Sequence, residues 1–595
     1  MSMRGVLLEL RRRNVLRAAV LYATSVWALA QGIAQLGPAV NAPEWTTRWF
    51  LVAAIIGFPF WIAFASFYEL TPQGIRRESE VVPSESVARA TGRRLDFWII
   101  GVLAVAVVLL LTDRFVTHRD GQFAIADKSI AVLPLANESG DPGALYFSDG
   151  LSEDLITALS RFSGLKVIGR NSAFKFRNST EASDVIGEKL GVVHLLEGSV
   201  RRAGDVVRVS AEVINTRDGS TLWSEHYDRP YKDLFQLQDD ITNAVATALK
   251  AKLLSGDDAA ARSARPPSGN LAAYSAYLMG KFYVNSRVDE TDTRKAIDAF
   301  TTATRLDPRY ATAWAGLSIA WTNLATGYLS AAPAQHAFAS ARAAADTALA
   351  LGPNLANAHL AQGTLLENAE SDLAGAEAEY RRAVQLAPND DSAKFDLGFV
   401  LAKLGQIHQA IAWTRQSLAV DPLDASAYYQ IASFLLPLGR LDEAEQAIRR
   451  ATAQQPKGTS FQAERAVVEI LRGDAKEALA AAQREPPGPW QDVAVALAQQ
   501  IGGDRAVADA ALKTLIDKHA DDAPFQIAEV HALRNDPDKT FEWLDRAWAV
   551  RDGGVQLLLY DPFILRYRGD PRFAAYCRKV GLPATTDATT GAAAP

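Results

Sequence analysis

Three carboxylates and one glycine-flanked lysine are the first residues in this 595-residue chain whose types and spacing could do chemistry. Asp149, Glu153 and Asp154 lie near an apolar helical stretch, where they could form a metal or acid–base site. Carboxylates at a helix start more often cap its N–H groups and face its dipole, and we favour that interpretation. Gly187-Glu-Lys-Leu-Gly191 is not a phosphate loop, because its glycine and lysine are in the wrong order and no Ser or Thr follows the lysine.

The single cysteine is a further candidate. Cys577 lies among Arg572, Arg578 and Lys579, which could lower the pKa of its thiol, but a packed small residue near the end of a helix is the interpretation we favour. One cysteine cannot form an internal disulfide framework or a multi-thiolate metal site. The eight histidines are scattered singly, and no nucleophile elbow, dinucleotide glycine motif or EF-hand is present. The sequence therefore predicts no enzyme, no metal and no cofactor.

Charge and length indicate the class of protein. The 62 Lys and Arg against 68 Asp and Glu give a net charge of −6, which provides no basic footprint for phosphate, so we expect no nucleic-acid partner. A chain of this length is too long to fold around a single hydrophobic core. We expect a multidomain protein.

Three apolar stretches near the N-terminus could cross a bilayer, residues 15–36, 49–68 and 97–112. A transmembrane helix needs roughly 17 to 25 apolar residues, so the third stretch is short. The first contains Gln31 and Gln35, which leaves a helix lying on the membrane surface as the alternative. We expect residues 1–119 to form a membrane anchor of about three transmembrane helices that contacts the lipid bilayer.

The arginine distribution predicts the orientation, because short loops rich in Lys and Arg stay in the cytoplasm. The loop at 37–48 holds only Arg48, whereas arginines cluster before the first stretch and between the second and third. Three crossings would place the chain after about Arg114 on the periplasmic side of a bacterial inner membrane, and two crossings would return it to the cytoplasm. The clustered residues are Arg4, Arg11, Arg12, Arg13, Arg17, Arg76, Arg77, Arg89, Arg93 and Arg94.

Short segments of this region carry a family resemblance. They are Glu9-Leu-Arg-Arg-Arg-Asn-Val15, Pro43-Glu-Trp-Thr46 and Phe67-Tyr-Glu-Leu-Thr-Pro-Gln-Gly-Ile75. They resemble the N-terminal membrane region of bacterial envelope proteins that carry TolB-like and tetratricopeptide domains. The resemblance implies anchoring and location, and adds no chemistry.

Residues 128–254 predict a small α/β domain with a mixed sheet, since strand-like and helical periods alternate and then give way to a hairpin. The expected strands are 129–135, 165–168, 194–202, 207–213 and 221–227, and the expected helices are 151–162, with Asp149 as its N-cap, 182–190 and 234–253.

Several blocks of this domain occur in the order of one family. They are Ser129-Ile-Ala-Val-Leu-Pro-Leu135, Tyr146-Phe-Ser-Asp-Gly-Leu-Ser-Glu-Asp154, and His194-Leu-Leu-Glu-Gly-Ser-Val200 through Leu222-Trp-Ser-Glu225. They resemble the TolB-like (FlgO-related) domain, which implies an envelope interaction domain without catalytic machinery. Relatives of that domain are attached to nucleotide cyclases or winged-helix regulators, and we expect neither module in this chain.

Proline spacing indicates the architecture of the second half. Pro308, Pro353, Pro388, Pro422 and Pro456 are 45, 35, 34 and 34 residues apart, and a 34-residue helix-turn-helix period is the tetratricopeptide signature. About eleven extra residues follow Trp314, and we expect them to loop out near 329–333. After a linker at 255–270 we therefore expect an all-α tetratricopeptide superhelix over 271–582, with degenerate C-terminal repeats and a cap, and then a disordered tail at 583–595. The endings Tyr560-Asp-Pro562 and Gly569-Asp-Pro-Arg-Phe573 resemble the terminal cap of the same envelope proteins.

The first helix of each repeat predicts a partner-binding groove, because positions i, i+4 and i+7 share one helical face. Aromatic residues on such a face are typical binding anchors, although they could instead pack against a neighbouring helix or the α/β domain. We expect a protein or peptide ligand there, and the sequence leaves homo-oligomerisation open. The expected function is an interaction scaffold, and the alternative is a transmembrane sensor or regulatory subunit that relays an envelope signal to a cytoplasmic partner. The candidate residues are Leu360, Thr364, Glu367, Phe395, Phe399, Lys403, Tyr429 and Ser433.

Overall fold

The computed structural model divides the chain into two compact units, residues 1–122 and 123–595. In the first unit, strands β1 (Tyr68–Thr71) and β2 (Gly74–Arg77) pair antiparallel. Apart from single positions, the three expected membrane spans lie outside the described residues, and none of the helices that are described has the length and apolar character needed to cross a membrane. The described residues are 128–253, 265–286 and 289–587, with Tyr22, Val26, Ala54, Phe58, 68–71 and 74–77.

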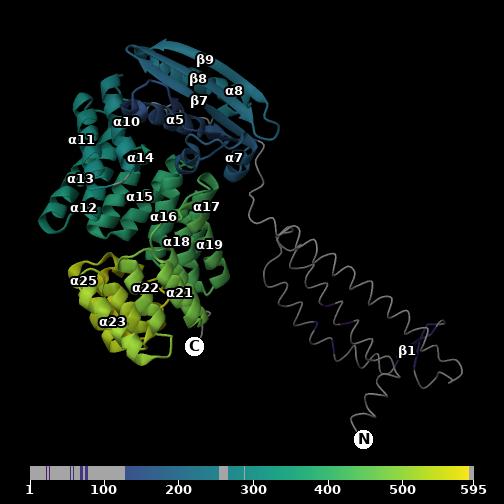
Figure 1. The fold of residues 1–595 in the computed structure, drawn as a ribbon, viewed down its shortest axis with the longest axis vertical. Coiled ribbons are helices and arrows are strands. Elements are labelled where there is room, and N and C mark those ends of the chain that lie inside the picture. The colour runs from purple at the N-terminus through teal and green to yellow at the C-terminus, as the bar shows by residue number, and fades with distance from the viewer. Residues whose placement is uncertain are drawn as a thin grey trace, which may run out of the picture. The chain divides into compact units, whose positions relative to one another are not determined.

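A mixed sheet begins the second unit, and the helices packed on it are drawn in blue in Figure 1. Its strand order is β6-β3-β7-β8-β9, and β4 also pairs with β7. The strands β6, β3 and β7 run parallel, whereas β7, β8 and β9 form an antiparallel meander. The small α/β domain with a mixed sheet is thus confirmed. The strands are β3 (Ser129–Val132), β4 (Ala136–Asn137), β6 (Lys166–Val167), β7 (His194–Ala203), β8 (Val206–Asn215) and β9 (Thr221–Pro230), while β5 (Phe162–Ser163) pairs separately with β10 (Lys252–Leu253).

Strand β3, which lies between β6 and β7, is buried on both faces, as its largely apolar sequence predicts. Ile130 and Val132 pack into the core that α5 (Leu145–Leu159) and α8 (Leu234–Ala248) cover. Ala131 and Leu133 pack into a second core beneath α6 (Arg170–Ala173) and α7 (Ser183–Leu190). The sheet therefore lies between two helical layers.

Helix α5 begins six residues before the predicted start at 151, and the expectation that Asp149 caps it is wrong. Helix α5 follows directly on the 3₁₀ turn η3 (Pro142–Ala144), and its own N-cap position, Ala144, makes no side-chain capping bond. Asp141 caps that turn, where its Oδ1 accepts a hydrogen bond from Gly143 N at 2.8 Å. An aspartate followed by a proline is a typical helix start. Asp149 therefore lies inside the helix.

Antiparallel helix pairs follow one another through the rest of the chain (Figure 1). The five spaced prolines each follow the second helix of a pair, because proline cannot continue a helix. The predicted tetratricopeptide superhelix is confirmed. The pairs are α10 (Leu271–Ser286) with α11 (Glu290–Leu306), α12 (Ala311–Gly327) with α13 (Ala331–Leu351), α14 (Ala356–Leu365) with α15 (Leu373–Leu386), α16 (Asp391–Lys403) with α17 (Ile407–Val420), α18 (Ala425–Leu435) with α19 (Leu441–Gln454), α20 (Phe461–Arg472) with α21 (Ala475–Arg484), α22 (Pro489–Gln499) with α23 (Arg505–His519), and α24 (Pro524–Leu533) with α25 (Pro537–Val550).

Small residues allow the paired helices to approach closely. A Cβ atom on Gly363 would lie 2.6 Å from the ring of Tyr380, and one on Gly280 would lie 2.7 Å from Phe300. The expected loop-out near 329–333 is wrong, since α13 already begins at Ala331 and the extra residues lengthen the helices. Alanine favours helix strongly, and Pro333 is tolerated in the first turn.

The α/β domain and the first repeat share one hydrophobic core, which includes Leu155 of α5 and Tyr274 and Tyr277 of α10. A Cβ atom on Gly150 would lie 2.6 Å from Leu278, so α5 and α10 are in close contact. Beyond α25, the chain continues through η8 (Gly553–Leu557), η9 (Ile564–Tyr567) and α26 (Pro571–Val580).

The last described residues return to the fourth repeat. Asp587 accepts a hydrogen bond from Ile407 N at 2.6 Å, and its own N–H donates to Gly405 O at 2.9 Å. Asp587 therefore caps α17 from 180 residues further along the chain. Of the predicted linker at 255–270, only the part from Arg265 on is described, and Arg265 pairs with Asp239 at 2.6 Å.

Candidate functional site

The candidate groove residues lie on the first helices of three consecutive repeats, α14 with its one-turn extension η6 (Leu366–Glu370), α16 and α18. Phe395, Phe399 and Tyr429 are half-buried and pack at the edge of the hydrophobic core of the array. Their inner edges thus contribute to the core. Of the other candidates, Leu360, Thr364 and Ser433 are also half-buried, and Glu367 and Lys403 are buried.

The two charged candidates pair with each other. Lys403 Nζ donates a hydrogen bond to Glu367 Oε1 at 2.6 Å, and Tyr380 Oη donates to Glu367 Oε2 at 2.6 Å. The Lys403 ammonium also lies 4.3 Å from the centroid of the Phe399 ring. Lys403, a predicted groove residue, thus meets a carboxylate from the preceding repeat in the described structure.

The C-terminal segment crosses the same surface. Lys403 Nζ donates to Gln556 Oε1 at 2.6 Å, 153 residues further along the chain. Tyr560 packs edge-on against Phe434 of α18, with ring centroids 5.4 Å apart. The segment 556–563, which contains the Tyr560-Asp-Pro562 ending expected in the terminal cap, therefore also lines the groove.

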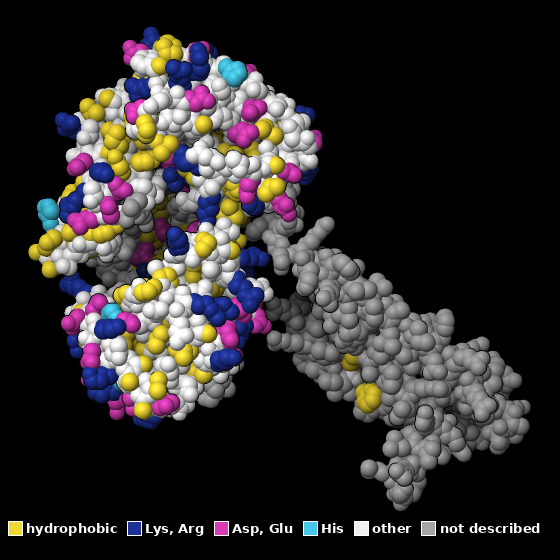
Figure 2. All heavy atoms as spheres, in the orientation of Figure 1, with side chains coloured by type: hydrophobic (Ala, Val, Ile, Leu, Met, Phe, Trp, Pro, Cys, Tyr) yellow, Lys and Arg dark blue, Asp and Glu magenta, His cyan; other side chains and the backbone are white. Residues whose placement is uncertain are grey.

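A cavity of about 250 Å³ lies where this segment meets the groove. Phe399, Tyr429 and Ser433 line it from the predicted positions, and Glu464 of α20 and Glu529 of α24 line it from helices that the sequence analysis left out of the site. Figure 2 shows the visible face of the array hollowed, with acidic side chains inside the hollow.

The 34-residue period could have found part of this cavity. Glu464 lies one period after Gln430 of α18, and both residues line the cavity. Asp561 has no such signal, because it reaches the cavity from the non-repetitive segment after α25.

Burial dominates the electrostatics of the cavity. Desolvation raises the pKa of Glu464 to about 7, although a hydrogen bond with Ser433 opposes the shift. Desolvation, reinforced by the neighbouring Asp561, raises the pKa of Glu529 well above its usual range. Burial also raises the pKa of Asp561, although the hydrogen bonds that it accepts from the backbone N–H groups of Phe563 and Ile564 oppose the shift. Burial therefore favours the protonated forms of these carboxyl groups.

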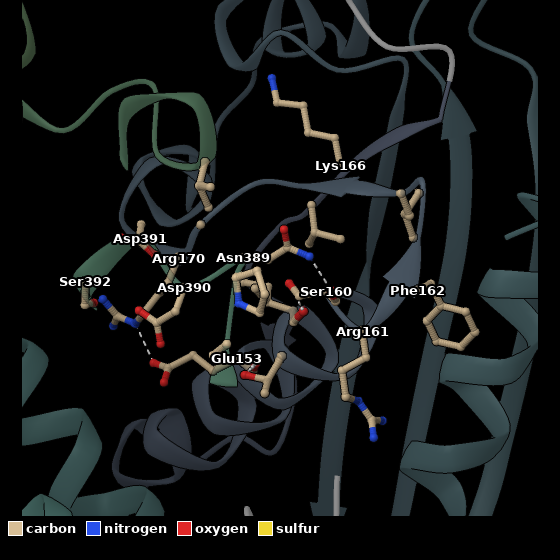
Figure 3. Close-up of a pocket in the computed structure, with 18 of the residues that line it drawn as sticks. Glu153, Ser160, Arg161, Phe162, Lys166, Arg170, Asn389, Asp390, Asp391 and Ser392 are labelled. Atoms are coloured by element: carbon tan, nitrogen blue, oxygen red, sulfur yellow. Dashed lines mark hydrogen bonds and ion pairs between the residues drawn. The ribbon is translucent and has the colours of Figure 1, made fainter. Parts of the chain in front are cut away.

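A larger cavity, about 770 Å³, lies between α5 and the turn before α16 (Figure 3). Arg170, Asp390 and Glu153 gather at one end of it, and Lys166 lies at the opposite end. Desolvation raises the pKa of Asp391 well above its usual range and lowers that of Lys166. Groups of both signs line this cavity, so its chemistry selects no single ligand class.

The three carboxylates near the start of the α/β domain lie on α5, and each forms an ion pair or a hydrogen bond with a residue outside that helix. Asp149 accepts a hydrogen bond from Arg177 at 2.6 Å. Glu153 is buried between Arg170 and Lys281 of α10, with the Lys281 Nζ at 2.7 Å. Asp154 accepts from Tyr274 of α10 and from Gln238 of α8. Glu153 and Asp154 therefore hold the α/β domain against the first repeat, whereas Asp149 pairs within the domain, and the sequence indicated neither role.

Cys577 is fully buried, which confirms the packed interpretation. Desolvation raises the pKa of its thiol to about 11, and the alternative of a lowered pKa is wrong. Two of the three neighbouring cations are engaged elsewhere, Arg572 with Asp538 and Lys579 with Asp545. The third, Arg578, opposes the rise in the pKa of the thiol but is outweighed by desolvation. Within the described ranges, no group of three or more His, Cys, Asp or Glu side chains is placed to hold a metal ion.

Comparison with known proteins identifies the repeats. The tetratricopeptide repeat family matches residues 395–459 and 438–492, where α16 to α22 lie. The chain therefore carries tetratricopeptide repeats, and they form a protein–protein interaction scaffold.

A second comparison corrects the prediction that the chain is not an enzyme. A segment of 133 residues is 47% identical to a Rhizobium meliloti (strain 1021) protein named putative adenylate cyclase 3. That name is the name of an enzyme, so the exclusion drawn from missing motifs is wrong. The segment is 22% of this chain and 23% of the relative, so the chain spans less than a quarter of the protein it matches.

Solved structures of similar proteins share only low overall similarity. YrrB, described as a tetratricopeptide protein with an unusual peptide-binding site, is 21% identical over 36% of this chain and 99% of its own, with a TM-score of 0.26. PilW, a type IV pilus biogenesis factor, is 18% identical over 41% and 99%, with a TM-score of 0.31. Yeast Tom70 is 17% identical over 52% and 67%, with a TM-score of 0.33. At these scores they carry no argument about the function of this chain.

Proposed function

We propose that this chain is an inner-membrane-anchored scaffold that presents its α/β domain and repeat groove to a protein or peptide partner on the periplasmic side. The three apolar stretches and the arginine clusters support the anchor and its orientation. The resemblance of the first 80 residues to envelope proteins, and of the α/β domain to TolB-like domains, supports the same location.

One observation carries the partner-binding part of the proposal. Phe395, Phe399 and Tyr429 lie half-buried on consecutive first helices and lead into a cavity of about 250 Å³. A face that is only solvated would carry polar side chains, whereas aromatic anchors beside a pocket are typical of binding hot spots.

The test is site-specific cross-linking of the full chain in bacterial cells, with a photoreactive residue at Ser433. We expect a defined cross-linked protein that is lost from the double variant Phe395→Ser, Phe399→Ser and kept in the control Leu351→Ser, Val550→Ser, whose two positions are exposed. Equal melting temperatures would show that the loss is one of binding. A cross-link that persists in the Phe395, Phe399 variant would reject the groove.

The identity to a putative adenylate cyclase favours a second candidate, in which the chain takes part in cyclic AMP formation or relays an envelope signal to a cyclase. Purified full-length chain in lipid nanodiscs, incubated with ATP and Mg²⁺ or Mn²⁺, tests the direct form of this candidate. Cyclic AMP above that of a heat-denatured sample would support it. If none forms, the relay form requires that deletion of the chain changes cellular cyclic AMP, and an unchanged level would exclude it.

A further inference from the structure

Three carboxyl groups meet in the 250 Å³ cavity from separate parts of the array. Glu464 comes from α20, Glu529 from α24, and Asp561 from the segment between η8 and η9. Glu529 hydrogen-bonds Asp561, and Asp561 Oδ1 accepts from Phe563 N at 2.9 Å and from Ile564 N at 2.7 Å. The lining residues include no Lys or Arg. Ionised carboxyl groups buried without a cation are costly, so a cation that enters the cavity would stabilise the charged forms of these groups.

Gln430 provides independent evidence that the cavity would bind a hydrogen-bond donor. The side chain of Gln430 lines the same cavity and is only 7% exposed, and its Oε1 has no hydrogen-bond partner in the described structure. A buried acceptor without a partner is unfavourable and calls for an N–H or O–H group. The unmet need is thus for a group that is both cationic and a hydrogen-bond donor.

The aromatic residues that line the cavity indicate what else the bound group must contain. Phe399, Tyr429, Phe434, Trp490 and Tyr560 line the cavity with aromatic surface. Aromatic faces attract an ammonium or guanidinium within about 6 Å of the ring centroid, and they also cover an alkyl stem. A cavity of about 150 Å³ accommodates a benzene-sized molecule, so 250 Å³ suits one long side chain and is too small for a folded element.

We propose that this cavity receives a Lys or Arg side chain of the partner segment that the groove binds. The alkyl stem would lie between the aromatic walls, and the cationic end would meet Glu464, Glu529 and Asp561 and donate to Gln430 Oε1. This inference rests on the proposed function, since it names the chemistry of the anchor that enters the same groove.

The groups that face these carboxyls predict a pH dependence. Glu464 faces Ser433 and Asp561, and Glu529 faces Asp561, Glu464 and Asp552. The positive charge of Arg566 lowers the pKa of Asp561. Arg566 lies outside the cavity lining, and its Nη1 donates a hydrogen bond to Ala532 O at 2.8 Å. Because acidic neighbours dominate, a bound cation would favour loss of a proton from Glu464. We expect affinity for a basic segment to rise between about pH 6 and pH 8.

The experiment selects peptides from a display library of random 12-residue sequences on the full-length chain in lipid nanodiscs. We expect the retained peptides to share one Lys or Arg. Replacing that residue with norleucine for Lys, or citrulline for Arg, should weaken binding at least tenfold to the unaltered chain. The substitution Glu464→Gln should weaken the basic peptide by a similar factor, and the control Glu542→Gln on the surface of α25 should not.

Two results separate this inference from the proposed function. Retained peptides that bind equally well with norleucine or citrulline would overturn the cationic anchor and leave the groove as a peptide site. A library that yields no retained peptide would overturn both. Because the norleucine and citrulline comparison uses the unaltered chain, it decides the matter even if Glu464→Gln alters folding.

Discussion

Lys403 and Glu367 form a buried ion pair between adjacent repeats, with Nζ and Oε1 2.6 Å apart and both side chains 7% exposed. Each charge also has a neutral partner, Gln556 for the lysine and Tyr380 for the carboxylate. The pair therefore links α14, α16 and the C-terminal segment at one point of the groove.

Removing only one partner of this pair should be costly. Lys403→Met leaves Glu367 buried without its cation, and we expect about 3 kcal/mol of lost stability. The double variant Lys403→Met, Glu367→Gln should recover most of that loss, because no unpaired charge remains. Thermal melting of the full-length chain in detergent gives the comparison, and equal losses in the single and double variants would show that the pair is not coupled.

A second prediction concerns the small position of the fourth repeat. Ala410 is fully buried where α16 and α17 cross, and Ala410→Trp should destabilise the array by about 1 to 3 kcal/mol through overpacking. Ala412→Trp on the exposed face of α17 is the matched control. Unchanged melting of the Ala410 variant would mean that the crossing has room that the structure does not show.

The buried Glu464 predicts a pH-dependent stability. Its folded-state pKa of about 7 lies above the usual value of 4.5, so the folded chain holds this proton more tightly than the unfolded chain. That contribution is complete below about pH 4.5 and is lost as pH rises towards 7. The unaltered chain should therefore lose about 2.5 kcal/mol of unfolding free energy between pH 5 and pH 8 relative to the Glu464→Gln variant. Melting curves at the two pH values measure it, and parallel curves would place this carboxyl in contact with water.

The orientation of the chain gives a fourth prediction. Alkaline phosphatase fused after Ala260 should be active and a cytoplasmic reporter fused there silent, because three crossings follow from the arginine distribution. The opposite pattern of activities would mean two crossings and a cytoplasmic groove.

Regular features of this fold could be predicted from the sequence because they are encoded locally. The spacing of Pro388, Pro422 and Pro456 fixes the repeat register, and the alternation of Val207, Val209, Ala211 and Val213 predicts the buried face of β8. An apolar period of 3.6 or 2 in the sequence indicates only which face of a helix or strand is buried. It does not report what covers it.

The parts that could not be predicted depend on contacts between distant segments. Gln556 contacts Lys403, and Asp561 lines the same cavity as Glu464, because the C-terminal segment returns to the groove, and no local pattern encodes that return. The role of Glu153 was missed for the same reason, since its partner Lys281 belongs to the first repeat. Asp149 was misplaced because the stronger start signal, Asp141 before Pro142, was not considered.

The cap that Asp587 provides to α17 changes how the repeats depend on one another. In most repeat arrays each unit contacts only its neighbours, so stability grows roughly as a sum over units and units can be gained or lost during evolution. Here Asp587 is hydrogen-bonded to the fourth repeat, and the repeats from the fourth to the last belong to a closed circuit of contacts. Inserting or deleting one unit would move Asp587 away from Ile407, so the circuit constrains the number of repeats as well as their order.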